Sequence, residues 1–273
     1  MTLDKAVEKK LKKGRDKVAV GVDKYVKDPN NQDAVHDVRT SLRRLEATFS
    51  LLPKKTRQAN SEYLKNCRKF FRANSKIRDY DVIRERIGGQ ATAILLNELE
   101  TGRKSELGRT KKLAAMLVES PRIKQMNLQK SRVEDRADKV AGRLIKGIEK
   151  LIPVVLADER NVDDLHDLRK KCKKLRYILD TIDPAHGKKH ESSFAKVMSS
   201  YGKKAYQKDV AASLRELQDI LGSIHDIDIT IDFVEAHDAK QLISDERLKR
   251  RLAYNKFVDY VARPKSDAVS TRN

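Results

Sequence analysis

The sequence predicts an all-α protein, and three observations support this prediction. Glycine and proline, which interrupt helices, number only eleven and six among 273 residues. Apolar residues recur three and four positions apart along most of the chain, which places them on one face of an α-helix. No segment sustains the alternation of apolar and polar residues, bounded by turn residues, that is typical of β-strands.

The boundaries of the predicted helices follow from these apolar spacings and from the residues that interrupt them. Long helices are expected at 3–26, 33–52, 56–77, 92–118, 132–152, 163–181, 192–221 and 240–262, with shorter ones at 80–87 and 227–236. Breaks are expected at Pro29, Pro53, Gly88, Pro121, Pro153 and Pro184. The polar segment 264–273 is expected to be a disordered tail.

Two motifs occur twice in the same order, which indicates an internal duplication. The first reads Asp-Ala-Val-His-Asp-Val-Arg-Thr-Ser-Leu-Arg-Arg-Leu at 33–45, and its second copy, at 163–175, reads Asp-Asp-Leu-His-Asp-Leu-Arg-Lys-Lys-Cys-Lys-Lys-Leu. The second reads Ile-Arg-Asp-Tyr-Asp-Val at 77–82 and Ile-His-Asp-Ile-Asp-Ile at 224–229. We therefore predict one domain over 1–263, built from two similar helical halves at 1–121 and 122–263. Duplicated halves usually pack about a pseudo-two-fold axis, so matching helices should lie side by side.

The overall charge is strongly positive. Sixty Lys and Arg face forty Asp and Glu, which gives a formal net charge of +20. Such an excess repels itself in a compact fold and attracts anionic polymers or anionic membranes. The charged first thirteen residues lack the apolar core of a signal peptide, and no apolar run approaches the roughly 20 residues of a membrane span. With only two cysteines, Cys67 and Cys172, we expect a reducing, cytoplasmic location.

The two copies of the first motif each predict a basic helix face. At about 100° per residue, His36, Arg39 and Arg43 fall opposite the apolar residues of their helix, with Arg44 at the edge of this face. The second copy repeats this arrangement with His166, Arg169, Lys173 and Lys174. Rows of Arg and Lys one helical turn apart can follow a chain of phosphates, because both side chains donate to phosphate oxygens.

A further cationic stripe is predicted on the helix that follows the first motif. Its members recur at helical spacing and are Lys65, Arg68, Lys69, Arg72 and Lys76. Like charges this close repel one another, and an anionic ligand would relieve that repulsion. A thinner stripe in the second half comprises Lys204, Lys208 and Arg215. The alternative interpretation is that such stripes are ordinary solvated faces.

The histidines and acids of the motifs allow more than one interpretation. His36 and His166 either donate to phosphate, with protonation favoured by the anion, or form hydrogen bonds within a seam between helices. The acids at 33 and 163 either cap a helix or contribute to a carboxylate metal site, and we favour capping. The acids at 79, 81, 226 and 228 are expected at helix starts. His186 and His190 have a metal-like spacing, but we expect them in a loop and assign them no role.

These residues resemble the CHAD family of histidine-containing α-helical domains. The resemblance covers nearly the whole chain and is carried by the His-x-x-Arg-x-x-x-basic-basic motifs and the Arg/His-Asp-x-Asp elements. It implies two pseudo-symmetric four-helix bundles with a basic groove that binds polyphosphate, and association with polyphosphate granules. The family's binding residues would be His36, Arg39, Arg43, Arg44, His166, Arg169, Lys173 and Lys174. We add Arg78 and Lys170 as candidates. The sequence departs from the pattern at His225, where the first copy has Arg78, and in having lysines at 173 and 174.

We therefore expect a non-enzymatic protein that binds inorganic polyphosphate, with possible partner proteins at granules and with neither a cofactor nor a resident metal. The sequence contains no Gly-rich phosphate loop and no paired nucleophile and base. The triphosphate-tunnel enzyme domain that often accompanies CHAD domains has no counterpart here. Non-specific DNA or RNA binding is the main alternative, although few aromatic residues could stack on bases. A metal-dependent phosphohydrolase that uses His-Asp pairs is a third.

Overall fold

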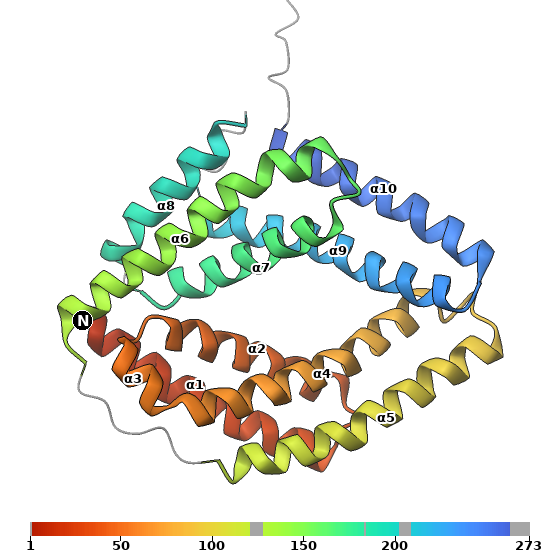
Figure 1. Cartoon of the computed structure of the whole chain (residues 1–273), viewed down its shortest axis with the longest axis horizontal. Helices are drawn as coiled ribbons and strands as arrows, with labels where there is room; N and C mark the ends of the chain where they lie inside the picture. Colours follow the sequence, from red (N-terminus) through yellow and green to blue (C-terminus); the bar gives the residue numbers. More distant parts are fainter. Residues whose placement is uncertain (1, 121–127, 183, 202–208, 263–273) are drawn as a thin grey trace, which may run out of the picture.

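The computed structural model describes residues 2–120, 128–182, 184–201 and 209–262, which form ten α-helices and no strand (Figure 1). The prediction of an all-α fold is confirmed. The first five helices are α1 (Leu3–Lys27), α2 (Gln32–Ser50), α3 (Lys54–Ala59), α4 (Ser61–Ile87) and α5 (Ala93–Val118). The other five are α6 (Lys130–Ala157), α7 (Val162–Leu179), α8 (Pro184–Ser199), α9 (Val210–Ala236) and α10 (Lys240–Ala262).

The helices of the two halves correspond in order and, with one exception, in length. Two long helices are followed by a shorter one and then by two more long helices in each half. The exception is the third helix, which has 6 residues in α3 and 16 in α8. Each half therefore contains a fifth helix beyond the four that the family resemblance implied. The predicted boundary between the halves, at 121/122, lies outside the described residues.

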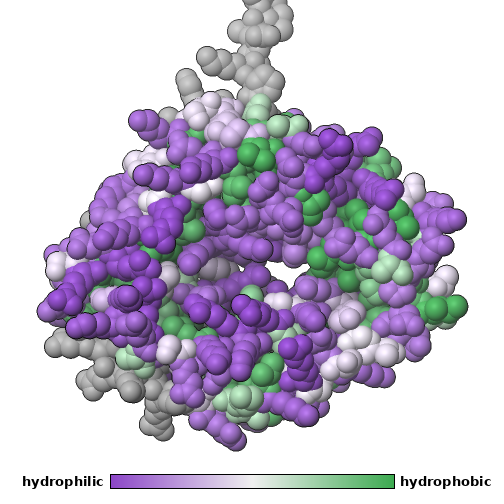
Figure 2. Space-filling view, in the orientation of Figure 1, coloured by the Kyte–Doolittle hydropathy of each residue, from purple (hydrophilic) through white to green (hydrophobic). Residues whose placement is uncertain are grey.

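The halves are joined at both ends by buried apolar residues. One cluster contains most of the buried side chains of α1 and α2 together with Val133, Ala137 and Tyr177 of the second half. A smaller cluster at the other end joins α4 and α5 to α9 and α10 through residues such as Ile87 and Val234. A third cluster belongs to the second half alone. Between the two joined ends, the space-filling view shows an opening that passes through the molecule (Figure 2).

Several predicted boundaries were wrong. Helices expected at 56–77 and 80–87 are one helix, α4, preceded by the short α3. The expected helix 192–221 is instead divided between α8 and α9, and α9 continues through 227–236. Pro153 lies inside α6 rather than ending it. Its missing N–H removes one helical hydrogen bond near the end of α6, and the fully buried Ile152 and Val155 hold this turn in place.

The helix caps and motif acids also differ from the prediction. Asn31, not Asp33, caps α2, because its side chain accepts a hydrogen bond of 3.0 Å from the Ala34 amide. Asp163 likewise lies in the first turn of α7, after the N-cap residue Asn161. The acids at 79, 81, 226 and 228 lie within α4 and α9 rather than at helix starts, since no residue near them interrupts either helix. In the described part of the chain, we find no helix apolar and long enough to cross a membrane.

Candidate anion-binding site

The four helices that carry the repeated motifs meet between the two halves. α2 packs against α4 and α7, and α9 packs against α7 and α4. The first motif of each half lies on α2 or α7, and the second lies on α4 or α9. These helices border the opening in Figure 2, which lies between the α2/α4 pair and the α7/α9 pair of Figure 1. The fold therefore brings all four motif copies to one region.

Eight ionisable side chains from these four helices influence one another across the halves, and we call them the central cluster. Its first-half members are Arg39, Arg43, Arg78 and Asp79, and its second-half members are Arg169, Lys173, His225 and Asp226. All eight are half-buried. Five of these side chains are cationic and two are carboxylates, in a partly desolvated space, and Arg78 also lies 3.8 Å from the exposed Glu85.

In the first half, the backbone and an aromatic ring hold the arginines. Arg39 Nη1 donates to the carbonyl oxygens of Ser75, at 3.0 Å, and Asn74, at 3.4 Å. The guanidinium carbons of Arg39 and Arg43 lie 5.7 and 5.1 Å from the centre of the Phe71 ring. Such contacts attract a cation to the ring face without neutralising its charge. Both guanidinium groups are therefore positioned while they remain available to an anion.

Three cations of the central cluster have no hydrogen-bond or ion-pair partner among the described residues. Within the described part of the chain, Arg43, Arg169 and Lys173 form no hydrogen bond or ion pair, and Arg169 Nε is fully buried. Buried polar groups normally find a partner, and an unpaired charge is especially costly. Gly222 lies beside Arg169, and an added Cβ there would be in ordinary van der Waals contact with Nε, at 3.9 Å. The unpaired donors of these three side chains are therefore available to an anion.

Burial and mutual repulsion change the acid–base behaviour of the central cluster. Burial, together with the charges of Arg43 and Arg169, lowers the pKa of Lys173 to about 7. Burial and the charge of Arg43 lower the pKa of Arg39 to about 10. Burial also raises the pKa of Asp79 and of Asp226, although the nearby arginines oppose this. The central cluster therefore carries an excess of positive charge, which an anion would offset.

The two motif histidines have different surroundings. His36 is exposed, with Nε2 3.5 Å from Thr40 Oγ1, whereas His166 Nε2 lies 3.1 Å from Asp228 Oδ2 and 3.0 Å from His225 Nδ1. Burial and the charge of Arg169 lower the pKa of His225 to about 3, so its ring is neutral near pH 7. His166 thus forms hydrogen bonds in a seam between helices, as one of the two interpretations of the motif histidines expects. Among the described residues, His36 has no comparable contacts with a neighbouring helix.

A buried acid–arginine pair supports the second motif in each half. Arg103 Nε lies 2.8 Å from Asp81 Oδ1, and Arg250 Nε lies 3.2 Å from Asp228 Oδ1. The partners are 22 residues apart in both cases, and each pair fixes a motif helix to the helix that follows it. Asp228 also bonds His166, so the second pair reaches the central cluster directly. The sequence showed these acids but not their partners, because nothing marks Arg103 or Arg250 among the many charged residues.

The remaining predicted residues lie outside the central cluster. The stripe on α4 (Lys65, Arg68, Lys69, Arg72 and Lys76) is exposed, with Arg68 2.8 Å from Glu46 and Lys76 2.9 Å from Glu106. Lys170 and Arg215 are exposed on α7 and α9. Lys174 is half-buried near Glu46, Arg68 and Arg136. Lys204 and Lys208 lie outside the described residues.

Arg44 lies in a different basic groove, between α1 and α2, which we call the outer groove. This cavity has a volume of about 640 Å³. Six cations line it with two acids, and its lining includes Lys9, Lys12, Lys13, Lys17, Lys24, Arg44, Asp16 and Asp37. The structure therefore separates Arg44 from Arg43, although the two are adjacent in the sequence.

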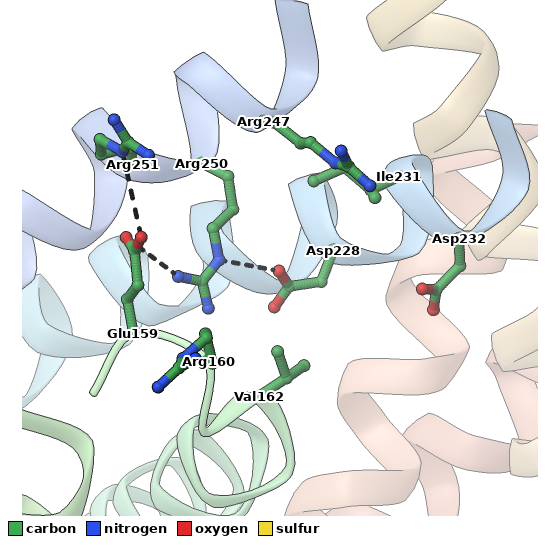
Figure 3. A pocket seen from close by; sticks show the side chains of 9 residues that line it. All are labelled: Glu159, Arg160, Val162, Asp228, Ile231, Asp232, Arg247, Arg250 and Arg251. Atoms are coloured by element: carbon green, nitrogen blue, oxygen red, sulfur yellow. Dashed lines mark hydrogen bonds and ion pairs between the residues drawn. The ribbon is translucent and has the colours of Figure 1, made fainter. Parts of the chain in front are cut away.

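A cavity of about 330 Å³ behind Asp228 is rich in arginine but balanced in charge (Figure 3). Arg250 reaches from α10 to both Asp228 and Glu159, at 3.2 and 3.7 Å. Arg247 pairs with Glu235 at 2.7 Å, and Arg160 pairs with Asp158 at 2.8 Å. Because its arginines already have acidic partners, this cavity is a weaker anion site than the central cluster.

The chain and its fold are similar to known proteins. The family model described as CHAD domain matches residues 10–235. The crystal structure of the CHAD domain from the plant Ricinus communis superposes with a TM-score of 0.57 and 15% sequence identity, covering 97% of this chain and 93% of that chain. At this identity, the likeness to the plant domain shows the fold alone. A comparison with curated proteins gives no match.

Proposed function

The chain belongs to the CHAD family, and from this premise we propose that it binds inorganic polyphosphate, without catalysis, through the central cluster between its two halves. The unpaired cations Arg43, Arg169 and Lys173 are the observation that carries this proposal. They come from both halves, so a single ligand would contact both copies of the first motif. Arginine forks and a lysine point charge are suited to phosphate oxygens.

The half-buried position of these cations favours a thin ligand. These cations lie on helices that border the opening between the two halves, and their burial partly excludes water from them (Figure 2). Polyphosphate has a charge on every unit and no bases or sugars, so it is a narrow polyanion. In this proposal, Asp79 and Asp226 limit repulsion among the cations and no residue is assigned a catalytic role.

The exposed cations would extend the binding track. Arg68 and Arg215 occupy matching places, about three helical turns before Asp79 and Asp226 on α4 and α9. A long chain that leaves the central cluster along α4 would pass Lys76, Arg72 and Lys69 before it reaches Arg68. Exposed contacts of this kind contribute little individually but add to the salt dependence of binding.

Paired substitutions in the two basic sites test the proposal. We expect Arg43→Ala with Arg169→Ala to weaken polyphosphate binding by about 100-fold or more, since hydrogen bonds to charged groups contribute about 1.5–3 kcal/mol each. The matched control removes two cations from the outer groove, Lys17→Ala with Arg44→Ala, and should change affinity by only a few-fold. Binding is measured by fluorescence anisotropy of end-labelled polyphosphate.

Thermal unfolding of both double variants, followed by circular dichroism, separates binding from folding. The central variant should unfold at the same or a higher temperature than the wild type, because it loses repulsion and no ion pair. Equal losses of affinity in the two variants would remove the central cluster from the proposal. Loss of helicity in the central variant would return Arg43 and Arg169 to a structural role.

The outer groove favours a second candidate function, non-specific binding of nucleic acid. Its cations lie on an accessible face between two helices, where the phosphates of a duplex could approach. In that case the outer-groove variant, not the central one, would lose affinity for duplex DNA.

Polyphosphate binding would place the protein in the cytoplasm, at polyphosphate granules. A fluorescent fusion should gather there, and the central variant should not.

A further inference from the structure

A separate group of metal-ligating side chains joins α6 to α8. His186 and His190 are four residues apart in α8, so their rings leave the same face of the helix. Nε2 of each ring lies 2.9 Å from Oδ1 of Asp138 on α6. The three ligand atoms lie within 4.8 Å of one another, and this is the one such trio found among the described residues. The expectation that this segment is a loop was wrong, and the helix is what brings the two rings together.

We propose that Asp138, His186 and His190 form a binding site for a divalent transition-metal ion, Zn²⁺ by preference, with a fourth position open to water. Two imidazole nitrogens and one carboxylate oxygen form a ligand set that suits Zn²⁺, and three protein ligands leave a coordination position free. Two histidines one helical turn apart are a recurrent way to present two such nitrogens. This inference is independent of polyphosphate binding.

The distances between the ligand atoms suit the proposed ion. Zn²⁺ binds nitrogen and oxygen at about 2.0–2.2 Å, so ligand atoms around a tetrahedral ion lie about 3.3 Å apart. The present N···O distances of 2.9 Å are slightly shorter, as hydrogen bonds require. An ion in place of these hydrogen bonds would require each N···O distance to lengthen by only a few tenths of an ångström, and the two nitrogens already lie within 4.8 Å of each other. The three ligands are therefore close together before the metal arrives.

The burial of the trio also suits a metal site. The side chains of His186 and His190 are 14% and 8% exposed, whereas Asp138 is 41% exposed and leaves a route for entry. The two rings are therefore held in place by their surroundings, while the carboxylate remains accessible to an ion.

Lys189 orients the carboxylate. Its Nζ lies 2.6 Å from Oδ2 of Asp138, on the oxygen that does not contact the histidines. This bond leaves Oδ1 directed at the two rings, as outer partners do in metal sites. A bound ion would fix the start of α8 to the middle of α6 in the second half, where the first half has only the six-residue α3.

A titration with Zn²⁺ tests the proposal on the full chain, freed of metal by a chelator and kept without polyphosphate. We expect one tight Zn²⁺ per chain by calorimetry and a higher unfolding temperature with the metal. His186→Asn and His190→Asn should each weaken Zn²⁺ binding by about tenfold or more. The matched control is His237→Asn, at the exposed end of α9, which should bind Zn²⁺ like the wild type. Equal Zn²⁺ affinity in all four proteins would overturn the proposal.

Spectroscopy of the wild type provides a test that does not depend on how the variants fold. Substituted Co²⁺ should give the visible absorption of a tetrahedral site with nitrogen and oxygen ligands. In histidine-selective NMR spectra, one equivalent of Zn²⁺ should shift the signals of two histidines and leave the others in place. If Zn²⁺ shifts no histidine signal, or shifts that of His237 alone, the trio is a hydrogen-bonded link between α6 and α8 and no metal site.

Discussion

In the first half His36 lies exposed beside Thr40, whereas in the second half His166 is held between Asp228 and His225. The arginines differ in a complementary way. Arg39 is fixed by the backbone of α4 and by Phe71, while its counterpart Arg169 keeps a buried nitrogen without a partner. The halves thus share a scaffold and a motif, but their motif residues make different contacts. The first half positions its arginines, and the second half has a histidine network beside unpaired cations.

The largest expected effect comes from breaking the buried acid–arginine pairs. Asp81→Ala should destabilise the protein by about 3–5 kcal/mol, because it leaves Arg103 as a buried charge with only Asn30 nearby. Asp228→Ala should cost somewhat less stability, since Arg250 retains Glu159, but it should also weaken polyphosphate binding by releasing His166. Urea unfolding and binding titrations measure both effects.

The exposed Asp219 on α9 provides the control for these two substitutions. Asp219→Ala should change stability by no more than about 0.5 kcal/mol. If the two buried acids behave like Asp219, the pairs are not the shared scaffold of the halves. If Asp81→Ala weakens binding as much as Asp228→Ala, the proposed difference between the halves is wrong.

The histidines should show a smaller difference between the halves. His166→Gln should destabilise the protein by about 1–3 kcal/mol, because it disturbs the bonds to Asp228 and His225. His36→Gln should stay within about 0.5 kcal/mol of the wild type, since His36 is exposed. Urea unfolding distinguishes these outcomes, provided that the m-value of the unfolding curve is the same in all the proteins compared. Equal effects at the two positions would mean that the motif histidines have the same role.

The second half should also carry a pH dependence of binding. Lys173 has a pKa of about 7 in the free protein, and a bound anion would raise it toward the usual lysine value of 10.5. Affinity should therefore be complete below pH 7 and fall as the pH rises above it, by at most about tenfold per pH unit. Binding titrations between about pH 6 and pH 10 measure this fall.

The first half has Arg43 at the position of Lys173, and this suggests the control. Lys173→Arg should flatten the pH dependence, since arginine stays charged throughout this range. A wild-type profile that Lys173→Arg leaves unchanged would assign the titration to other groups, such as the ends of the polyphosphate chain.

The helical fold and the motif faces could be predicted from the sequence because the spacing of apolar residues depends on local helix geometry. Arg39, Arg43, Arg169 and Lys173 were predicted on helix faces, and the fold brings these faces together. Contacts between residues that are distant in the sequence could not be predicted. The position of Phe71 under two arginines and the pairing of Asp138 with His190 depend on how helices cross, which no local pattern encodes.

Errors along the chain have equally physical origins. The polar pair at 78–79, which separates the expected helices 56–77 and 80–87, lies within the continuous helix α4. It is polar because it faces the central cluster, not because the helix stops there. Similarly, Pro184 suggested a loop, whereas proline fits the first position of a helix and begins α8.

The most direct test of the central claim is a competition titration with metal-free protein. Labelled long-chain polyphosphate is bound at several salt concentrations and then displaced with duplex DNA or RNA at equal phosphate concentration. Binding that persists at moderate salt, and that nucleic acid displaces poorly, is the result expected of a half-buried cluster between the two halves. Displacement by DNA or RNA as effective as that by unlabelled polyphosphate would contradict the account and make the basic surfaces general polyanion sites.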